Sequence, residues 1–379
     1  MRVKVAEATA LFWDQSRLVW DDYIGHRQLA LSADSERVLR WFGDWAELDS
    51  IDELGDEYLA IAERLLDAGV LIAEDSDEHA IEQRVLANWG PWGPAARYLH
   101  LASRTPSGSR FLSAAQDAAE MQQQAFASSQ AEAAPPAAKT YPDRPLIPLA
   151  ARRPDDSGWP ARGLLDALYG RRSTRRFTAD PVSLDELAAI LQVAGGFVDP
   201  LEHAPGPAAL RTSPAAGALH PVEMYVDASS VDGLEAGMYH FAPTRGGIEA
   251  LADGDGARVA GTGAAVTGAA GKRSLDAVGG QPWLAEAPVL ILYTAVIERL
   301  QWRYRSPRAY RDLLIGLGHL SQTVLLLASA MNLGAVFATA VCDEDLERLI
   351  GIDGTSEILL GVAALGHPDS DAADQPITW

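Results

Sequence analysis

The first part of the chain changes from strand-like to helix-like spacing of its hydrophobic residues. Apolar and polar residues alternate in LFWDQSRLVWDD and HRQLALS, and this period of two predicts strands. In ADSERVLRWFGDW and SIDELGDEYLAIAERLLDAG the apolar residues recur three and four positions apart, which predicts two helices. Ser50 and Glu53 have capping-box spacing, and Gly69 suits the end of the second helix.

A short strand, VLIAE, follows these helices. The order of strand, helix, helix and strand predicts a small winged-helix-like module over residues 1–85. Such modules often bind DNA, but Asp and Glu dominate residues 44–78 and supply no stripe of phosphate-neutralising charge. A peptide-binding role and a purely architectural role both remain open.

Residues 86–139 are predicted to connect this module to the rest of the chain. In NWGPWGPAARY two Gly-Pro pairs interrupt regular structure and predict a fixed bend. Residues 113–139 then lose hydrophobic periodicity and are rich in Ala, Gln and Ser, which is typical of a linker. Pro135 and Pro136 are expected to end any helix in it.

Residues 140–379 show an α+β pattern. Helices are expected over 162–170, over 183–196, where Ser183 and Glu186 have capping-box spacing, and over 310–334; strands are expected over 222–228, 287–296, 335–341 and 357–365. This order predicts a mixed sheet flanked by helices. Four polar residues interrupt the apolar run from Leu313 to Leu333, so it reads as a helix buried in protein rather than a membrane span.

Composition narrows the function classes. Hydrophobic residues make up 48% of the 379 residues and charged residues 22%, which fits a globular protein. The net charge of -21 repels phosphate backbones, so nucleic acid is not an expected partner, and no membrane partner is expected either. Cys342 is the only cysteine, so no internal disulfide or thiolate metal site is expected, and a cytoplasmic location is predicted.

A basic turn between two predicted helices is the first candidate site. It reads Arg171-Arg172-Ser173-Thr174-Arg175-Arg176-Phe177. Arginines at alternating positions of an extended segment point to one side and can grip a phosphate together. A solvated surface turn is the alternative on charge alone.

This turn, followed by S-x-x-E-L-A-x-I-L-Q-x-A-G-G, resembles the opening of the nitroreductase superfamily. The resemblance implies an FMN-binding nitroreductase-like domain over residues 140–379, with Arg171, Ser173 and Arg175, and the adjacent Arg172, holding the cofactor. It also implies a homodimer, because such domains generally place FMN at an interface between two copies.

Two further motifs are similar to those of SagB-type dehydrogenases, FMN enzymes that oxidise azolines in ribosomally made peptides. The first is the loop TSPAAGALHPVE, in which Ser213, Pro214, Ala216 and Gly217 are implied flavin contacts. Small side chains let backbone amides approach a flat ring closely. The second motif is WRYRSPRAYR, leading into a helix with G-H and then Q, where the implied contacts are His319 and Gln322.

The sequence departs from that pattern at the position of the proton acceptor. Azoline-oxidising members often carry a Lys-Tyr pair, where this chain has Arg303-Tyr304. Arginine side chains keep their proton near neutral pH, so Tyr304 is the first candidate for the base. Tyr310 and His319 are further candidates, each with the alternative of being a structural core residue.

The C-terminal end departs as well, since Asp369 stands where the family often has a basic residue. The phosphate would then rest on Arg171 and Arg175, with Arg308 or His367.

Three functions remain in competition. The first is a peptide dehydrogenase that acts on azolines, together with other peptide-modifying enzymes. The second is an NAD(P)H-dependent nitro or quinone reductase, and the third is an inactive protein that binds the precursor peptide. The N-terminal module and the loop at 212–223 favour the first.

Overall fold

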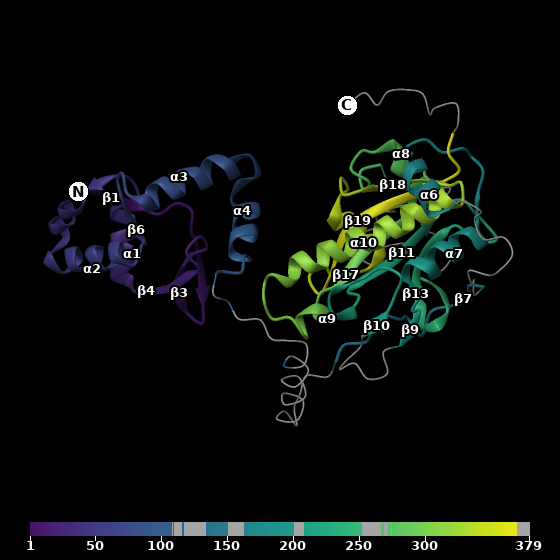
Figure 1. Cartoon of the computed structure of the whole chain (residues 1–379), viewed down its shortest axis with the longest axis horizontal. Helices are drawn as coiled ribbons and strands as arrows, with labels where there is room; N and C mark the ends of the chain where they lie inside the picture. The colour runs from purple at the N-terminus through teal and green to yellow at the C-terminus, as the bar shows by residue number, and fades with distance from the viewer. Residues whose placement is uncertain are drawn as a thin grey trace. The chain divides into compact units, whose positions relative to one another are not determined.

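The computed structural model describes residues 1–107, 109, 116, 134–150, 163–200, 208–251, 267–268, 272–273 and 275–369. The chain divides into two compact units, Met1–Phe111 and Leu112–Trp379 (Figure 1).

The first unit combines two small antiparallel sheets with helices. One sheet has the order β5-β1-β6 and the other is the meander β2-β3-β4. The elements are β1 (Arg2–Val5), β2 (Ala10–Asp14), β3 (Arg17–Asp22), β4 (Arg27–Leu31), α1 (Ala33–Trp41), β5 (Ala46–Glu47), α2 (Asp56–Asp67), β6 (Leu71–Ala73), α3 (Asp77–Trp89) and α4 (Gly93–Ala102). Trp20, Phe42 and Ile51 are fully buried at the centre of its core. The predicted order of strands, two helices and a short strand is therefore present.

One predicted helix start in this unit is wrong. Ser50 and Glu53 lie in a 3-10 helix, Leu48–Leu54, and α2 begins only after Gly55, whose φ is 128°. The Ser50 hydroxyl accepts a hydrogen bond from Trp41 Nε1 at 3.0 Å instead of capping a helix. Gly69, with φ at 78°, does follow the end of α2 as predicted.

The Gly-Pro segment forms a turn between two helices that belong to the first unit. A 3-10 turn, Gly90–Trp92, separates α3 from α4. Arg97 Nε donates to Tyr23 Oη at 2.8 Å and Tyr98 Oη donates to Asp21 at 2.9 Å, so α4 is bonded to β3 and the residues just after it. The first unit thus extends past residue 85, and most of the predicted linker lies outside the described residues.

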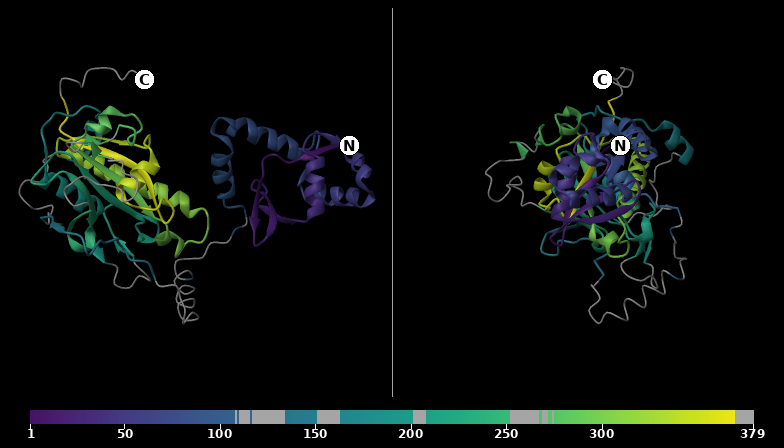
Figure 2. Two further views of the ribbon diagram at one scale, coloured as in Figure 1. Left: turned by 180° about the vertical axis from the view of Figure 1, so that it is seen from behind. Right: turned by 90° about the vertical axis from the view of Figure 1, so that its left-hand side faces the viewer.

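A seven-stranded sheet forms the centre of the second unit (Figures 1 and 2). Its strands, in order across the sheet, are β18 (Gly334–Ala338), β19 (Glu357–Gly366), β17 (Val289–Val296), β11 (Val222–Ala228), β13 (Gly237–Ala242), β14 (Gly247–Ala250) and β7 (Leu146–Pro148). Every described pair of neighbours in it is antiparallel. The sequence predicted a mixed sheet, and this part of the prediction is wrong.

Short pairs of strands lie outside this sheet. They are β8 (Val182–Ser183) with β12 (Val231–Asp232), β9 (Asp199–Pro200) with β10 (Ala209–Leu210), and β15 (Thr267–Gly268) with β16 (Lys272–Arg273). The first of these pairs is parallel.

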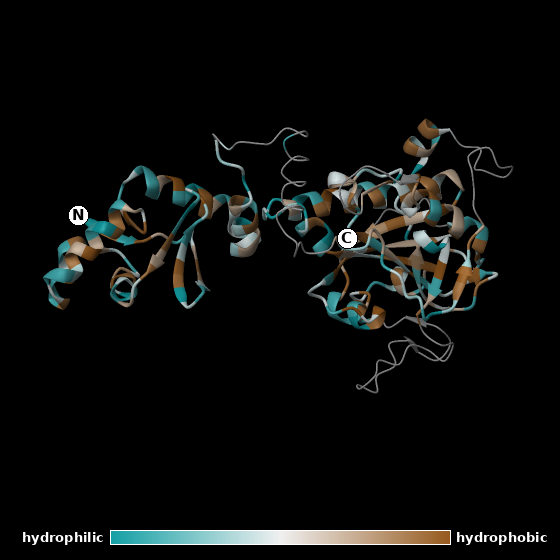
Figure 3. Cartoon of the chain, turned by 90° about the horizontal axis from the view of Figure 1, so that it is seen from below, coloured by the Kyte–Doolittle hydropathy of each residue, from teal (hydrophilic) through white to brown (hydrophobic). Residues whose placement is uncertain are grey.

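Helices cover both faces of the central sheet. One face packs against α7 (Leu184–Gly195) and α10 (Ala309–Ala330), and the other against α8 (Pro282–Ala285) and α11 (Asp343–Ile350). Ser183 and Glu186 form the predicted capping box at the start of α7. Hydrophobic colouring is prominent along the strands of the interior (Figure 3).

Among the described residues, α10 is the one helix whose length and composition would allow it to cross a membrane. Leu317, Leu320 and Val324 on this helix are buried against the sheet. The helix therefore packs as the core helix that the sequence predicted.

The face of the sheet opposite α10 carries a buried cluster of charged groups. Glu223 on β11 accepts hydrogen bonds from Arg299 Nη2 at 2.5 Å and from the Lys139 backbone N–H at 2.7 Å. His240 lies between Glu223 and Glu249, its ring nitrogens 3.3 and 2.9 Å from their carboxylates. Burial alone would raise the pKa of Glu223, but the charge of Arg299 and the hydrogen bond with His240 outweigh it and lower the pKa to about 2.

Candidate active site

The basic turn is bonded to the edge of the central sheet. It follows α6 (Leu164–Gly170) and runs beside β18, where the Thr174 N–H donates to the Ala335 carbonyl at 3.1 Å. A Cβ added to Gly334 would lie 2.5 Å from Thr174 Cγ2, so only glycine permits this approach. Further along, the Thr178 N–H donates to the His367 carbonyl at 2.9 Å. The turn is therefore fixed against two segments from the C-terminal part of the chain.

A cavity of about 240 Å³ opens beside this turn. Its lining is Gly170, Arg171, Arg172, Thr174, Leu325, Ser329, Asn332, Leu333, Gly334, Ala335 and Pro368. Of the four residues of the turn that the resemblance implied as cofactor contacts, Arg171 and Arg172 line this cavity, and Ser173 and Arg175 do not. Arg171 ends α6, so the alternation of an extended strand begins only after it.

The other predicted residues of the turn do not line this cavity. The Arg175 guanidinium lies 5.6 Å from the centre of the Trp283 ring. Ser173 is exposed, and its backbone pairs with that of Ala335 in a single β-bridge.

His367 and Arg308, the further residues expected at the phosphate, do not line the cavity either. His367 Nε2 is 3.2 Å from the Pro181 carbonyl. Residues 370–379 lie outside the described part of the chain.

The small-residue loop is bonded to α10. Ser213 Oγ is 2.6 Å from Thr323 Oγ1, and His319 Nδ1 lies 3.1 Å from the Pro214 carbonyl, to which it can donate. His319 is exposed, so the interpretation of this histidine as a core residue is wrong. Its bond to the loop places it where the resemblance implied. Ala216 and Gly217 follow in a single 3-10 turn.

Tyr304 and Arg303 lie directly beside this loop. A Cβ added to Gly217 would be 2.7 Å from Tyr304 Oη and 3.1 Å from Arg303 Nη1. The Arg303 guanidinium is 5.4 Å from the centre of the Tyr304 ring, a distance at which a cation and an aromatic face attract. Tyr310 is not among the side chains nearest to Gly217 and is 39% exposed. Of the candidate bases, Tyr304 is therefore the one that the structure places at Gly217.

This contact leads to a prediction for Gly217→Ala. The φ of 58° strains any residue with a side chain, and the added methyl group would also force Tyr304 to move. Gly246 is a matched control, because its φ is 65° and nothing lies within 4 Å of an added Cβ. We expect Gly217→Ala to lower the free energy of unfolding by roughly 1–3 kcal/mol more than Gly246→Ala, measured by chemical denaturation. Equal losses would show that Tyr304 does not occupy this position.

An exposed stripe of α10 includes Ile315, Gly318 and Gln322. The loop meets α10 at His319 and Thr323, while the cavity beside the turn meets it at Leu325 and Ser329. From Thr323 to Ser329 the helix rises only about 9 Å. The two segments thus meet the same helix within a short distance of each other.

Arg211 is a candidate residue that the sequence motifs did not indicate. Its Nε and Nη2 atoms are buried with no hydrogen-bond partner among the described residues, and its guanidinium lies 4.8 Å from the Phe197 ring centre. Burial lowers its pKa to about 10, which still leaves it charged at neutral pH. Its position directly before the small-residue loop was the feature of the sequence that could have identified it. Two unsatisfied donors beside Ser213 and Pro214 make Arg211 a candidate ligand contact.

His220, by contrast, serves the loop's structure. Burial and the charge of Arg211 together lower its pKa to about 4, so the ring is neutral at pH 7. Its Nε2 donates to the Ala209 carbonyl at 2.8 Å. The ring therefore holds the end of the loop against β10.

Comparison with known proteins identifies the fold. A sequence model described as the nitroreductase family matches residues 168–367. The chain belongs to the nitroreductase family. It is 31% identical over 199 residues to a nitroreductase-like protein of Methanocaldococcus jannaschii, a match that spans 52% of this chain and 89% of that protein.

Two more similarities were found. The trifolitoxin-processing protein TfxB of Rhizobium leguminosarum bv. trifolii is 27% identical over 176 residues, which is 45% of this chain and 44% of TfxB. A nitroreductase-type crystal structure from Anabaena variabilis is 22% identical and has a TM-score of 0.48, covering 70% of this chain and 50% of that one.

Membership confirms the predicted fold class, and it confirms that the protein is an oxidoreductase with FMN as its cofactor. The geometry fits that cofactor. A cavity with two arginines suits a phosphate group, and the loop of small residues suits a flat ring. Within the described residues, no group of three His, Cys, Asp or Glu side chains could hold a metal ion.

Proposed function

We propose that this protein is an FMN-dependent, SagB-type dehydrogenase that oxidises azoline rings of a ribosomally made peptide to azoles. The observation that carries the proposal is the position of Tyr304, whose hydroxyl group lies against Gly217 of the small-residue loop. A relative that processes a peptide, TfxB, supports a peptide as the substrate.

In this proposal the cofactor spans the exposed stripe of α10. Arg171 and Arg172 bind its phosphate, since bidentate guanidinium groups match phosphate oxygens. The ring lies at the small-residue loop, with contacts from Ser213, Pro214, Ala216, Gly217, His319 and Gln322. Ser173 and Arg175, which lie outside the cavity, support the turn.

Bound FMN supplies the hydride acceptor for the two-electron oxidation. The chain's own residues supply the base and its surroundings. Tyr304, in its phenolate form, takes the proton that leaves the carbon next to the ring nitrogen. The guanidinium of Arg303 lies over the Tyr304 ring and stabilises the negative charge of that form. Arg303 thereby assists the tyrosine where other members have lysine.

The variant Tyr304→Phe tests this role. We expect it to lower the rate of flavin reduction by a thiazoline-containing peptide by roughly 10²- to 10⁴-fold, the usual contribution of a positioned base. FMN affinity should stay unchanged. Tyr310→Phe is the matched control and should have a much smaller effect, because the hydroxyl group nearest to Gly217 is that of Tyr304. Equal effects of the two variants, in stopped-flow absorbance, would contradict the assignment.

The whole function is tested with purified protein that carries FMN. Mixing with a thiazoline peptide in the absence of NAD(P)H should bleach the flavin spectrum, and the peptide should lose two hydrogen atoms by mass spectrometry. Bleaching only with NAD(P)H would instead indicate a nitro or quinone reductase. Failure to bind FMN would indicate an inactive peptide-binding protein.

We further propose that the protein acts as a homodimer in the cytoplasm, beside other peptide-modifying enzymes. The helix α6 supports a second copy, because Leu164, Leu165 and Tyr169 on it are 69%, 67% and 79% exposed. Exposed apolar side chains in one patch mark interaction surfaces. The molar mass in solution, measured by light scattering, tests the dimer.

A further inference from the structure

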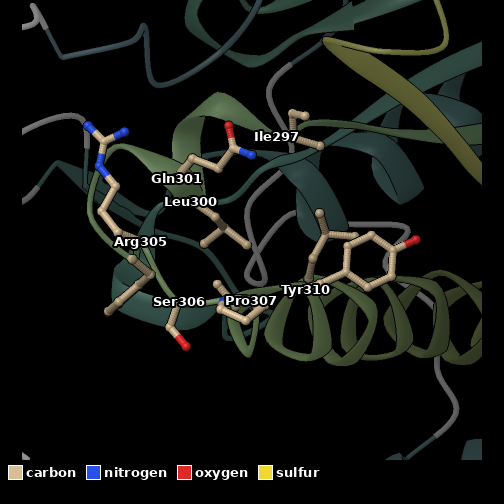
Figure 4. Close-up of a pocket in the computed structure, with 10 residues that line it drawn as sticks. Ile297, Leu300, Gln301, Arg305, Ser306, Pro307 and Tyr310 are labelled. Atoms are coloured by element: carbon tan, nitrogen blue, oxygen red, sulfur yellow. The ribbon is translucent and has the colours of Figure 1, made fainter. Parts of the chain in front are cut away.

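A second, larger cavity of about 480 Å³ lies beyond Tyr304. It is enclosed by α9 (Glu298–Gln301), the loop that follows it and the first turns of α10. Its lining is Ile297, Leu300, Gln301, Tyr304, Arg305, Ser306, Pro307, Ala309, Tyr310 and Leu313. Figure 4 shows Tyr310 rising from α10, with Leu300, Gln301 and Ile297 across the cavity from it.

The lining is apolar on the floor of the cavity and polar at its rim. Leu300 and Leu313 are buried, whereas Gln301 and Ser306 are exposed. A volume of this size falls within the range of about 300–1,000 Å³ that is usual for small-ligand pockets. No carboxylate lines the cavity. The floor of the cavity therefore suits an uncharged apolar group, and the rim offers amide and hydroxyl groups to a peptide backbone.

Tyr304 lies at the small-residue loop and also lines the second cavity. Its hydroxyl group lies at Gly217, and its side chain also forms part of the cavity wall. A group held in the cavity would therefore lie next to the atom on which Tyr304 acts.

We propose that this cavity binds the apolar side chain of the residue preceding the azoline ring, and so selects peptides with a leucine-like residue there. This inference rests on the proposed function. A leucine side chain would contact Leu300 and Leu313, and its neighbouring backbone amide would meet Gln301 or Ser306. A lysine side chain at the same position would lose its hydration without gaining a partner, because no carboxylate lines the cavity and Arg305 adds a positive charge to the lining.

The experiment uses the FMN-loaded protein and three N-acetylated peptides, in which glycine, leucine or lysine precedes a thiazoline. We expect kcat/KM for the leucine peptide to exceed that for the glycine peptide by roughly 10- to 100-fold, the effect of burying one aliphatic side chain. The lysine peptide should be no better than glycine. Equal rates for leucine and glycine would overturn the proposal.

Filling the cavity should remove the preference. Ala309→Phe and, as a second variant on an exposed lining residue, Ser306→Phe should reduce the leucine-to-glycine ratio to near one. Ala95→Phe places the same side chain on the exposed surface of α4 and should leave the ratio unchanged. Persistence of the preference in both filled variants would contradict the cavity as its source.

A binding measurement separates this inference from the proposed function. Calorimetry with the corresponding thiazole peptides needs no turnover. If no thiazoline peptide is oxidised but the leucine thiazole binds more tightly than glycine, and Ala309→Phe removes the difference, the cavity assignment stands and the proposed reaction falls. If filling the cavity abolishes flavin reduction by NADH while peptide selectivity persists, the cavity belongs to the nicotinamide and the inference is overturned.

Discussion

Replacing Glu223 with glutamine is expected to lower the free energy of unfolding by roughly 3–5 kcal/mol, measured by chemical denaturation at saturating FMN. The substitution keeps the size of the side chain but leaves Arg299 as a buried cation without its carboxylate. Glu223 and Arg299 are each 2% exposed, so water cannot replace the lost partner. The interaction with His240 is also weakened, since its ring nitrogen faces this carboxylate.

An exposed ion pair provides the control. Asp345→Asn breaks the bond between Asp345 and Arg348 on α11, which is 2.6 Å long. Solvent and salt screen such pairs, so the expected loss is less than about 1 kcal/mol. Similar losses of unfolding free energy for Glu223→Gln and Asp345→Asn would contradict the claim that burial makes the loss of Glu223 costly.

The stability that Glu223 contributes depends on pH. The folded-state pKa of Glu223, about 2, lies below its ordinary value of 4.5. Its contribution to the free energy of unfolding is therefore full above about pH 4.5 and disappears as the pH falls toward 2. The wild-type protein should therefore lose stability over this interval more steeply than Glu223→Gln. If the free energy of unfolding changed with pH in the same way in both proteins, Glu223 would not be held ionised.

The double variant Arg171→Ala/Arg172→Ala is expected to weaken FMN binding by at least 100-fold. Each charge-assisted hydrogen bond to phosphate contributes roughly 1.5–3 kcal/mol, and both arginines line the cavity beside the turn. Fluorescence titration of the apoprotein with FMN measures the change.

Riboflavin, which lacks the phosphate, is the internal comparison. Its affinity should change little in the double variant, so the preference for FMN over riboflavin should collapse. Arg176→Ala, in the same turn but outside the cavity, is the matched control and should keep the preference. Equal weakening of FMN and riboflavin would place the phosphate elsewhere.

Local patterns in the sequence were sufficient where a few neighbouring residues decide the structure. Ser183 and Glu186 form the predicted capping box, because their hydrogen bonds join residues three apart. The same spacing at Ser50 and Glu53 failed, because a new helix begins after Gly55 and Trp41, nine residues before Ser50, donates a hydrogen bond to the serine hydroxyl. A capping rule holds only where no contact from outside the helix competes for the capping side chain.

The candidate site shows the same division. Motif order along the chain was enough to predict the nitroreductase fold, FMN and the segments at 171–177, 212–223 and 302–311. It could not separate Tyr304 from Tyr310, because both lie in the third segment and only the contact with Gly217 distinguishes them.

The sequence by itself determined the fold class through its periodicity, and the cofactor through the resemblance of its motifs to a known family. Only the tertiary structure decided that Arg171 and Arg172 line a cavity from which Arg175 is absent, that Arg211 is a buried cation beside the loop, and that Glu223, His240 and Arg299 form one cluster. The physical reason is that these arrangements depend on segments about 20 to 160 residues apart meeting across the sheet and α10, and no local pattern records which side chains meet there.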